Sequence, residues 1–235
     1  MFADRFIAHR GGAAHAPENT LSAVREGAAR GAKWIEVDVS VLGDGTPVIF
    51  HDETLERTTN GKGKLSEHTW DDVAKLDAGS WFDPTFVGEP VTRLWELLDV
   101  VAELDLGLNL ELKTHHGERE ALVAAVVPEL RDAELPPDKL LVSSFDHDAL
   151  SAFRRAEQDA ALALLYWNFA EDWRDTAAAL NPISVNLSVK KITNADISAV
   201  KAAGLELYSY TVNDLDTADS LFARGIDGVF TDVVF

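Results

Sequence analysis

The sequence contains no cysteine among its 235 residues. This absence excludes disulfides, a thiol nucleophile and thiolate metal ligands, whereas the redox environment stays open because a chain without cysteine tolerates either one. Any metal must therefore be held by Asp, Glu or His. This donor set favours hard divalent cations such as Mg²⁺ or Ca²⁺ over structural zinc.

Basic residues are also scarce, since 21 Lys and Arg face 40 Asp and Glu and the net charge is −19. Affinity for nucleic acids comes largely from Lys and Arg that neutralise phosphates. Basic doublets occur only at 154–155 and 190–191. We therefore expect no nucleic-acid partner.

Long apolar runs are missing as well, because no stretch approaches the roughly 20 apolar residues that a spanning helix needs. Segment 1–10 lacks the apolar region of a signal peptide. These features predict no membrane insertion and a cytoplasmic location for the chain as given. Hydrophobic residues nonetheless make up 46% of the chain and charged residues 26%, which is typical of a globular protein. We expect one domain over residues 1–235.

Short β-rich runs alternate along the chain with helical patterns of about ten or more residues. The expected strands are 5–9, 33–39, 106–112, 139–144, 161–167, 183–187, 205–212 and 228–231. The expected helices are 19–30, 93–104, 117–133, 146–158, 170–179, 194–203 and 214–223. Eight strands joined by helices in a chain of this length predict an α/β fold, a TIM (β/α)₈ barrel.

Two features depart from a regular barrel. After the second strand come a second extended run at 47–50 and a long loop, and loops of that length are usually functional. After the last strand no residues remain for an eighth helix. One side of the first and last strands would then be uncovered, unless the insertion or a second copy in a homo-oligomer covers it.

Acidic side chains fall on one face of two expected strands. Glu36 and Asp38 alternate with apolar residues, and Glu111 lies between Asn109 and Lys113 in the same kind of pattern. Three converging carboxylates would form a cation site with positions left for water or substrate. In the alternative interpretation each acid is merely exposed at a strand edge, or Lys113 is the structural counter-ion of Glu111.

Two histidines favour the catalytic interpretation, because His9 ends the first strand and His51 ends the extra extended run. Phosphodiester cleavage needs charge neutralisation of the phosphate, a base for the attacking hydroxyl and an acid for the leaving alkoxide. Arg10 can bind phosphate oxygens with two donors, and Lys113 supplies a point charge. The two histidines can divide the roles of acid and base.

Eight short motifs, spread from about residue 6 to residue 232, resemble those of the glycerophosphodiester phosphodiesterase family in the same order. Single motifs match weakly, but all eight in sequence are specific. They are HRGG (9–12), PENT (17–20), EVD (36–38), PVIFHD (47–52), RTTNG (57–61), NLELK (109–113), SSFD (143–146) and YTVN (210–213).

The resemblance implies a TIM barrel that hydrolyses glycerophosphodiesters, such as glycerophosphocholine or glycerophosphoethanolamine, to sn-glycerol 3-phosphate and an alcohol. It implies a divalent cation, Mg²⁺ or Ca²⁺. It also implies that residues 53–91, with the run 76–82, form a small subdomain over the barrel mouth.

The resemblance further implies roles for individual residues. His9 would be the base for the glycerol 2-hydroxyl and His51 the acid for the leaving alcohol. This first step gives a cyclic phosphate that water then opens, with the two roles reversed. The metal carboxylates fall on Glu36, Asp38 and Glu111, and the phosphate ligands on Arg10 and Lys113.

Other residues are assigned from their positions. Glu18 either contacts the substrate or simply offsets the charge of Arg10. Phe145 is the candidate for a residue in the cavity wall that contacts the glycerol carbons. Tyr210 stands where the family commonly carries Trp, which keeps an aromatic wall and adds a hydroxyl within reach of glycerol or phosphate. We expect Tyr208 and Trp167 in the core, and Asn19 with Thr20 at a helix N-cap.

Two other functions share parts of this pattern. A phospholipase-D-like or phosphoinositide-type lyase would stop at the cyclic phosphate and act on membrane lipid, for which the sequence shows no apolar or cationic rim. A non-catalytic barrel that binds a partner would lack one of the histidines or carboxylates. All of these positions are filled.

Overall fold

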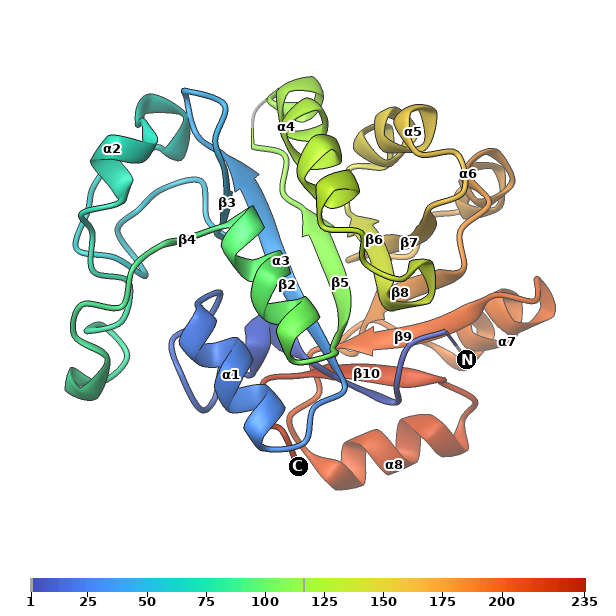
Figure 1. Cartoon of the computed structure of the whole chain (residues 1–235). Helices are drawn as coiled ribbons and strands as arrows, with labels where there is room; N and C mark the ends of the chain where they lie inside the picture. Colours follow the sequence, from blue (N-terminus) through green and yellow to red (C-terminus); the bar gives the residue numbers. More distant parts are fainter. Residues whose placement is uncertain (1, 116) are drawn as a thin grey trace.

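The computed structural model describes residues 2–115 and 117–235 and shows a closed barrel (Figure 1). Strand β1 pairs in parallel with both β2 and β10, which closes the sheet. This confirms the predicted TIM barrel. Its parallel strands in spatial order are β1 (Phe6–Ala8), β2 (Trp34–Val41), β5 (Gly107–Leu112), β6 (Leu140–Ser144), β7 (Ala161–Tyr166), β8 (Ser184–Ser188), β9 (Glu206–Tyr210) and β10 (Gly228–Thr231).

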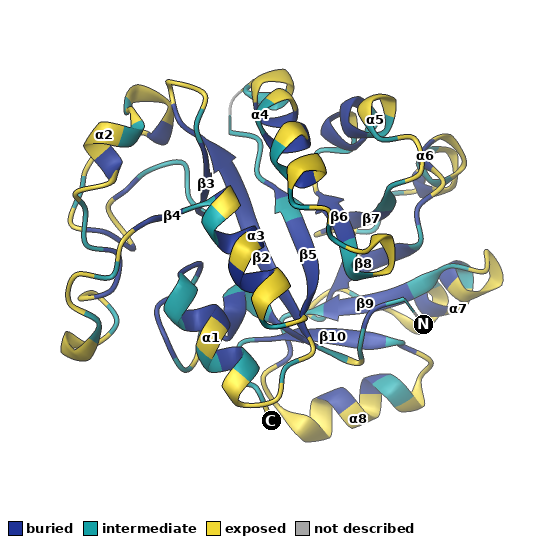
Figure 2. Ribbon diagram, in the orientation of Figure 1, coloured by how far each residue is buried: buried dark blue, intermediate teal, exposed yellow. Residues whose placement is uncertain are grey.

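Helices surround the barrel, with exposed residues on their outer faces and almost wholly buried strands inside them (Figure 2). In the described part of the chain no helix follows β10. The outer helices are α1 (Leu21–Ala29), α3 (Leu94–Glu103), α4 (Arg119–Asp132), α5 (His147–Ala156), α6 (Trp173–Leu180), α7 (Asn194–Ala202) and α8 (Leu215–Ala223). Short 3₁₀ turns lie at His9–Gly11, Leu65–Glu67, Pro84–Phe86 and Pro137–Lys139.

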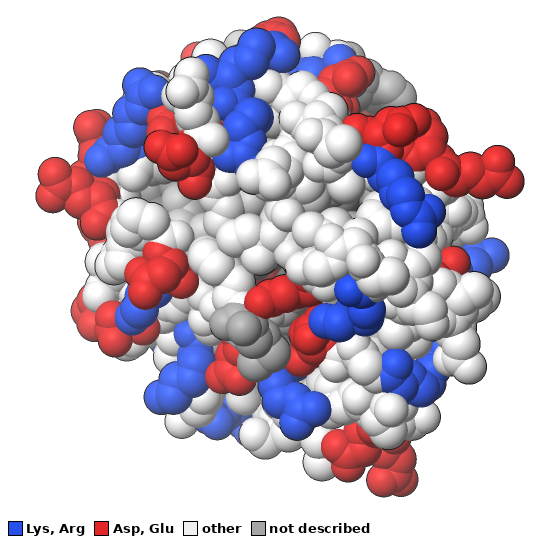
Figure 3. Space-filling view, turned by 90° about the vertical axis from the view of Figure 1, so that its right-hand side faces the viewer, with Lys and Arg blue, Asp and Glu red and all other residues white. Residues whose placement is uncertain are grey.

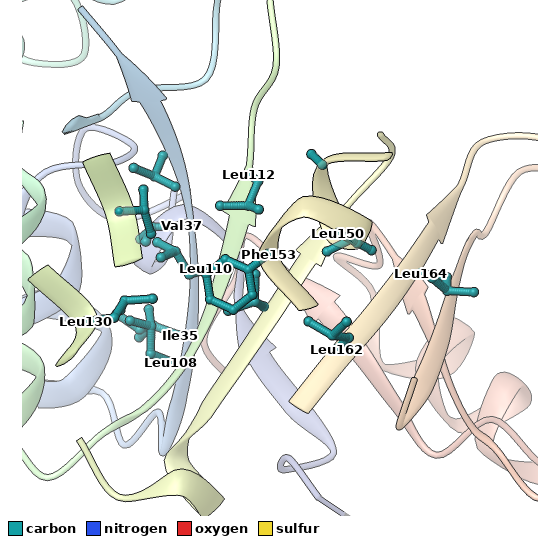
Figure 4. Close-up of a cluster of buried hydrophobic side chains, with 14 of the residues drawn as sticks. Ile35, Val37, Leu108, Leu110, Leu112, Leu130, Leu150, Phe153, Leu162 and Leu164 are labelled. Atoms are coloured by element: carbon teal, nitrogen blue, oxygen red, sulfur yellow. The ribbon is translucent and has the colours of Figure 1, made fainter. Parts of the chain in front are cut away.

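The main hydrophobic core lies between the strands and the helices. Alternate residues of a strand point to opposite faces, so one set on β2 and β5 faces outward and the other faces the barrel interior. Phe153 of α5 packs into this layer beside Leu110 (Figure 4). The outward residues of the two strands are Ile35, Val37, Leu108, Leu110 and Leu112, all buried.

A second apolar cluster fills the part of the barrel interior that lies nearest the amino ends of the strands. It contains Ile7, Trp34, Tyr208 and Phe230. The indole of Trp34 fits only because position 107 is glycine, since a Cβ there would lie 2.1 Å from the ring. The expected core position of Tyr208 is confirmed, and the interior is a packed plug at this end.

The side of the barrel without an eighth helix is covered by aromatic contacts. Phe6 of β1 packs edge-on against Phe222 of α8 and against Phe235, with ring centroids 5.6 Å apart in both pairs. Part of this side is therefore covered from within the chain. The homo-oligomer expected from the missing helix stays a prediction.

Two short strands flank the insertion of residues 53–91. They are β3 (Pro47–Ile49), which pairs antiparallel with β2, and β4 (Thr92–Arg93), which pairs with β3. Between them lies the short helix α2 (Trp70–Val73) and a separate hydrophobic cluster that includes Leu55 and Leu65. The RTTNG motif meets the run 76–82 here, because Asn60 N–H donates to the Asp77 carbonyl oxygen at 3.1 Å and Asp77 N–H donates to Asn60 Oδ1 at 3.0 Å. The insertion is thus an ordered structure with its own core.

Surface features agree with the composition. None of the helices in residues 2–115 and 117–235 has the length and apolar character needed to cross a bilayer. On the face drawn in Figure 3, Lys and Arg side chains are interspersed with Asp and Glu side chains. This face therefore presents no continuous basic surface.

The carboxylate of Asp77 accepts hydrogen bonds from the backbone N–H groups of Gly79, Ser80 and Gly88, and these bonds lower its pKa from the ordinary 3.8 to about 2. A depressed pKa means stability that is present above the unfolded value and lost as pH falls through the folded value. We expect Asp77→Asn to lower the Tm by about 2–4 °C near pH 6. The difference from the unmodified chain should shrink as pH falls toward about 2.

Thermal unfolding followed by circular dichroism at several pH values checks this expectation. Asp71→Asn, an exposed change in the same insertion, is the control and should leave the Tm unchanged at each pH. A Tm loss at Asp77 that did not vary with pH would contradict the electrostatic origin of its contribution.

Candidate active site

A cavity of about 270 Å³ opens where the barrel strands end. Active sites of this fold lie at the carboxyl ends of the strands. His9 follows β1, Glu36 lies on β2, and Glu111 and Lys113 lie at the end of β5. The structure therefore brings together residues that are more than 100 positions apart in the sequence. The cavity is lined by the polar residues His9, Arg10, Glu36, His51, Asn109, Glu111 and Lys113 and by the aromatic residues Phe145, Trp167, Tyr210 and Phe230, among others.

Three carboxylates converge on the inner face of β2 and β5. One oxygen each of Glu36, Asp38 and Glu111 lies within 4.8 Å of the others, and the first two residues are 2% and 1% exposed. Burial and the charge of Asp38 raise the pKa of Glu36 to about 8, and the same causes raise that of Glu111. Burying like charges so closely is unfavourable unless cations offset them.

Two cations of the chain provide part of that offset. Arg10 Nε lies 3.3 Å from Asp38 Oδ2, and Lys113 Nζ lies 2.8 Å from Glu111 and 3.8 Å from Asp38. Although burial acts in the opposite direction, the charges of Arg10 and Lys113 hold the pKa of Asp38 below its usual range. Asp38 therefore faces two side-chain cations, whereas Glu36 is approached by His9 Nε2 at 3.8 Å.

The carboxylate cluster has the chemistry of a hard-cation site. Glu36 Oε1 is buried and finds no hydrogen-bond partner among the described residues. Buried carboxylate oxygens without a partner are rare unless a metal or water satisfies them. Three carboxylates with an orphaned oxygen fit a divalent cation such as Mg²⁺ or Ca²⁺.

His9 is held by an acidic residue from the far end of the chain. Its Nδ1 lies 2.6 Å from Asp232 Oδ1, and Asn213 Nδ2 donates to the other oxygen of Asp232 at 2.7 Å. The free Nε2 lies 3.8 Å from Glu36. Against the effect of burial, the hydrogen bond to Asp232 and the charge of Glu36 raise the pKa of His9.

His51 has a similar partner in the neighbouring residue. Its Nδ1 lies 2.6 Å from Asp52 Oδ1, which leaves Nε2 free on the opposite edge of the ring. Burial lowers the pKa of His51, and the charges of Arg10 and Lys113 act in the same direction. The two histidines thus share one geometry and differ in their tendency to hold a proton.

The turn after β1 places Arg10 by an unusual backbone conformation. Arg10 has φ 51°, its N–H donates to Glu36 Oε2 at 3.0 Å, and its carbonyl accepts from Asn19 N at 3.1 Å. The next residue, Gly11, lies against α1, where a Cβ on Gly27 would stand 2.2 Å from its carbonyl oxygen. Small residues at both positions therefore allow the turn to dock on the helix.

Aromatic residues form part of the cavity wall. Phe145 and Tyr210 pack edge-on at 5.8 Å, and Trp167 also lines the cavity. The expectation that Trp167 lies in the core is wrong, because it is 50% exposed at the end of β7. The Tyr210 hydroxyl donates to the Tyr166 carbonyl oxygen at 2.7 Å, so its ring faces the cavity while its hydroxyl is already engaged.

Glu18 is not among the described residues that line this cavity, and its carboxylate pairs with Arg10 and Arg57. These contacts are those expected if Glu18 offsets the charge of Arg10, and a contact with the substrate stays a prediction. Glu18 therefore holds a cavity residue in place from behind.

The chain matches the model of the glycerophosphoryl diester phosphodiesterase family over residues 9–234. It belongs to this family. Among curated relatives it is 32% identical to a glycerophosphodiester phosphodiesterase of Caldanaerobacter subterraneus subsp. tengcongensis, over 96% of this chain and 93% of the relative. A second relative of that name, from Bacillus subtilis, is 31% identical over 96% of this chain and 82% of the relative.

Solved structures of the family give the same result. A phosphodiesterase from Oleispira antarctica, determined in complex with the product sn-glycerol 3-phosphate, superposes with a TM-score of 0.94 and 35% identity. The match covers 98% of this chain and 94% of that one. The chain is thus an enzyme of a phosphoric diester hydrolase family with the barrel fold.

Several residues around the site were missed by sequence reasoning. Asp232 reaches His9 only because β10 pairs with β1. Asn19, expected at a helix cap together with Thr20, instead donates to Asp38 Oδ2 at 2.8 Å, while Thr20 alone caps α1. The one feature of the sequence that could have indicated a role for Asp232 is its position, since it is an acidic residue directly after the last strand.

We expect Asp232→Asn to lower kcat by about 10²–10⁴-fold with little change in Tm. Because Asn213 Nδ2 donates to residue 232, the new amide would turn its oxygen toward Asn213 and its NH₂ toward His9. His9 Nδ1 would then have to accept, which moves its proton to Nε2.

Steady-state kinetics on a glycerophosphodiester and the tautomer of His9 by ¹⁵N NMR check this expectation. Asp214→Asn is the matched control, because Asn caps a helix about as well as Asp. Unchanged kcat in Asp232→Asn would show that the position of His9 does not depend on Asp232.

Proposed function

We propose that this chain hydrolyses glycerophosphodiesters, such as glycerophosphocholine and glycerophosphoethanolamine, to sn-glycerol 3-phosphate and an alcohol. The observation that carries the proposal is that one cavity is lined by two histidines, each hydrogen-bonded to an aspartate, together with Arg10 and Lys113 and beside the carboxylate cluster. The product bound to the Oleispira antarctica enzyme supports the same substrate class. In this proposal residues 1–235 form one catalytic domain, with 53–91 as an insertion subdomain.

The proposed mechanism divides the reaction between the two histidines. Arg10 and Lys113 bind phosphate oxygens and stabilise the charge that develops on them. One histidine Nε2 removes the proton of the glycerol 2-hydroxyl, whose oxygen attacks phosphorus to give a cyclic phosphate. The other histidine protonates the leaving alcohol, and both roles reverse when water opens the ring.

Glu36, Asp38 and Glu111 would hold the divalent cation in this proposal. When bound, such a cation neutralises the carboxylates, polarises a phosphate oxygen and acidifies a nearby hydroxyl. The aromatic wall of Phe145 and Tyr210 would contact the glycerol carbons. Trp167 lies beside them at the cavity rim.

The family resemblance assigns His9 as the first base and His51 as the first acid. The raised pKa of His9 and the lowered pKa of His51 mean that His9 holds a proton more readily in the free protein. The assignment therefore requires that His9 lose its proton before the first step. A substrate whose leaving group needs no proton distinguishes the two residues.

We expect His51→Ala to lose about 10²–10⁴-fold in kcat on glycerophosphocholine, and far less on a p-nitrophenyl glycerophosphodiester, whose leaving group needs no acid. His9→Ala should lose similar activity on both substrates. Release of sn-glycerol 3-phosphate and of nitrophenolate provides the measurement.

His68→Ala is the control for both histidine variants, since His68 lies in the insertion, where its Nε2 is 2.9 Å from the Lys62 carbonyl oxygen, and is not among the described residues that line the cavity. The reverse pattern of leaving-group dependence would exchange the roles of His9 and His51. A metal-replete protein that turned over no glycerophosphodiester would overturn the proposed function, and the non-catalytic barrel would be favoured. A cyclic phosphate as the only end product would favour the lyase.

Chelation should abolish turnover, and either Mg²⁺ or Ca²⁺ should restore it, since the buried carboxylates need a cation. We expect Glu36→Gln to weaken binding of the restoring ion by at least about tenfold in calorimetric titration. Glu103→Gln, an exposed change on α3, should bind it normally. Full activity after exhaustive chelation would contradict the metal requirement.

A further inference from the structure

Arg57, within the RTTNG motif of the insertion, binds two carboxylates that lie behind the catalytic cavity. Its guanidinium donates to both oxygens of Glu18 at 2.8 Å, and to both oxygens of Asp52, in one case at 2.9 Å. Glu18 in turn pairs with Arg10, and Asp52 with His51. Through Glu18, Arg57 is therefore linked to the proposed phosphate ligand Arg10. Through Asp52, it is linked to the proposed acid/base residue His51.

The two carboxylates converge on a single nitrogen of Arg57. Glu18 Oε1 and Asp52 Oδ1 both accept from Nη2, at 2.8 and 2.9 Å. Without the guanidinium these oxygens would face each other as like charges and move apart. Lysine cannot replace this contact, because an ammonium lacks the planar fork that binds two carboxylates with paired hydrogen bonds.

The backbone that carries Arg57 is anchored in the insertion. Leu55 is 1% exposed, and Thr59 donates to the Leu55 carbonyl oxygen through both its N–H and its hydroxyl. Asn60 is tied to Asp77 on the far side of the same segment. The side chain of Arg57 thus extends from a fixed turn toward the barrel, although it is itself 44% exposed.

We propose that Arg57 is a positioning residue that fixes His51, through Asp52, and Arg10, through Glu18, at the same time. This inference rests on the proposed function and adds a role for the insertion in it. The insertion supplies the one guanidinium in the described chain that contacts the partners of both groups. The four hydrogen bonds fix the directions of both carboxylates, so the contact acts on the geometry of the residues that they hold.

The decisive experiment compares Arg57→Ala and Arg57→Lys with Lys64→Ala. Lys64 is the matched control, because it is an equally exposed cation of the insertion whose ion pair, with Glu53, does not include the Arg57 contacts. We expect Arg57→Ala to lower kcat/KM by about 10–100-fold, with kcat reduced through His51 and KM raised through Arg10. Arg57→Lys should fall between, and Lys64→Ala should stay within about twofold of the unmodified chain.

Added ethylguanidinium should restore part of the activity of Arg57→Ala and none of that lost in His51→Ala.

A second measurement needs no substrate, and so tests the contact even if no glycerophosphodiester is cleaved. In ¹H–¹⁵N spectra of the imidazole rings at about pH 8, His51 should be the Nδ1–H tautomer. His147 of α5, whose Nε2 lies 3.2 Å from the Leu165 carbonyl oxygen, should serve as an internal reference. Arg57→Ala and Arg57→Lys should change the His51 signals and leave those of His147 in place.

Unchanged kinetics and unchanged His51 signals in both Arg57 variants would overturn the proposal. A loss of activity with an unchanged His51 spectrum would also overturn it, because Arg57 would then not position His51. The Lys variant keeps the charge, so it decides the outcome if the Ala variant fails to fold.

Discussion

The burial of three carboxylates inside one end of the barrel is the constraint on which the rest of the site depends. Glu36, Asp38 and Glu111 lie on neighbouring strands whose register places them side by side, with Asp38 opposite Glu111. A closed parallel barrel can bury these charges because its other end is a packed apolar plug that holds the strands rigidly. Such like charges are tolerated only where cations or hydrogen bonds offset them.

Charges of alternating sign extend outward from this cluster. Arg10 faces Asp38, Glu18 faces Arg10, and Arg57 faces Glu18. The side chains of Asp38, Arg10 and Glu18 are 1%, 16% and 10% exposed, and that of Arg57 is 44% exposed. Each buried or nearly buried charge is therefore held by one of opposite sign, and the best solvated charge lies at the outer end. The last charge in this series, Arg57, lies in the insertion, so the insertion contributes a residue to the charge network of the site.

Sequence reasoning predicted what depends on local pattern. The period of two in 34–39 and 106–112 placed Glu36, Asp38 and Glu111 on one face, and the order of the motifs indicated the barrel and its family. Asp232 and Arg57 could not be assigned, because their contacts arise from barrel closure and from the docking of the insertion, which no local period encodes. The prediction for Trp167 was wrong because the local sequence pattern does not distinguish two positions of a large aromatic residue at a strand end. Such a residue either packs in the core or lines the mouth of the barrel.

In the proposed mechanism, the same charge balance would couple the cation to the substrate. Arg10 and Lys113 are each engaged with carboxylates in the free protein, so a phosphate would have to compete for their donors. A cation held by Glu36, Asp38 and Glu111 would weaken the attraction of these carboxylates for both residues, while Glu18 would still hold Arg10. Linkage then requires that the anion strengthen cation binding by the same factor. The proposal thus confines the attraction for an anionic diester to the cavity of a chain whose net charge is −19.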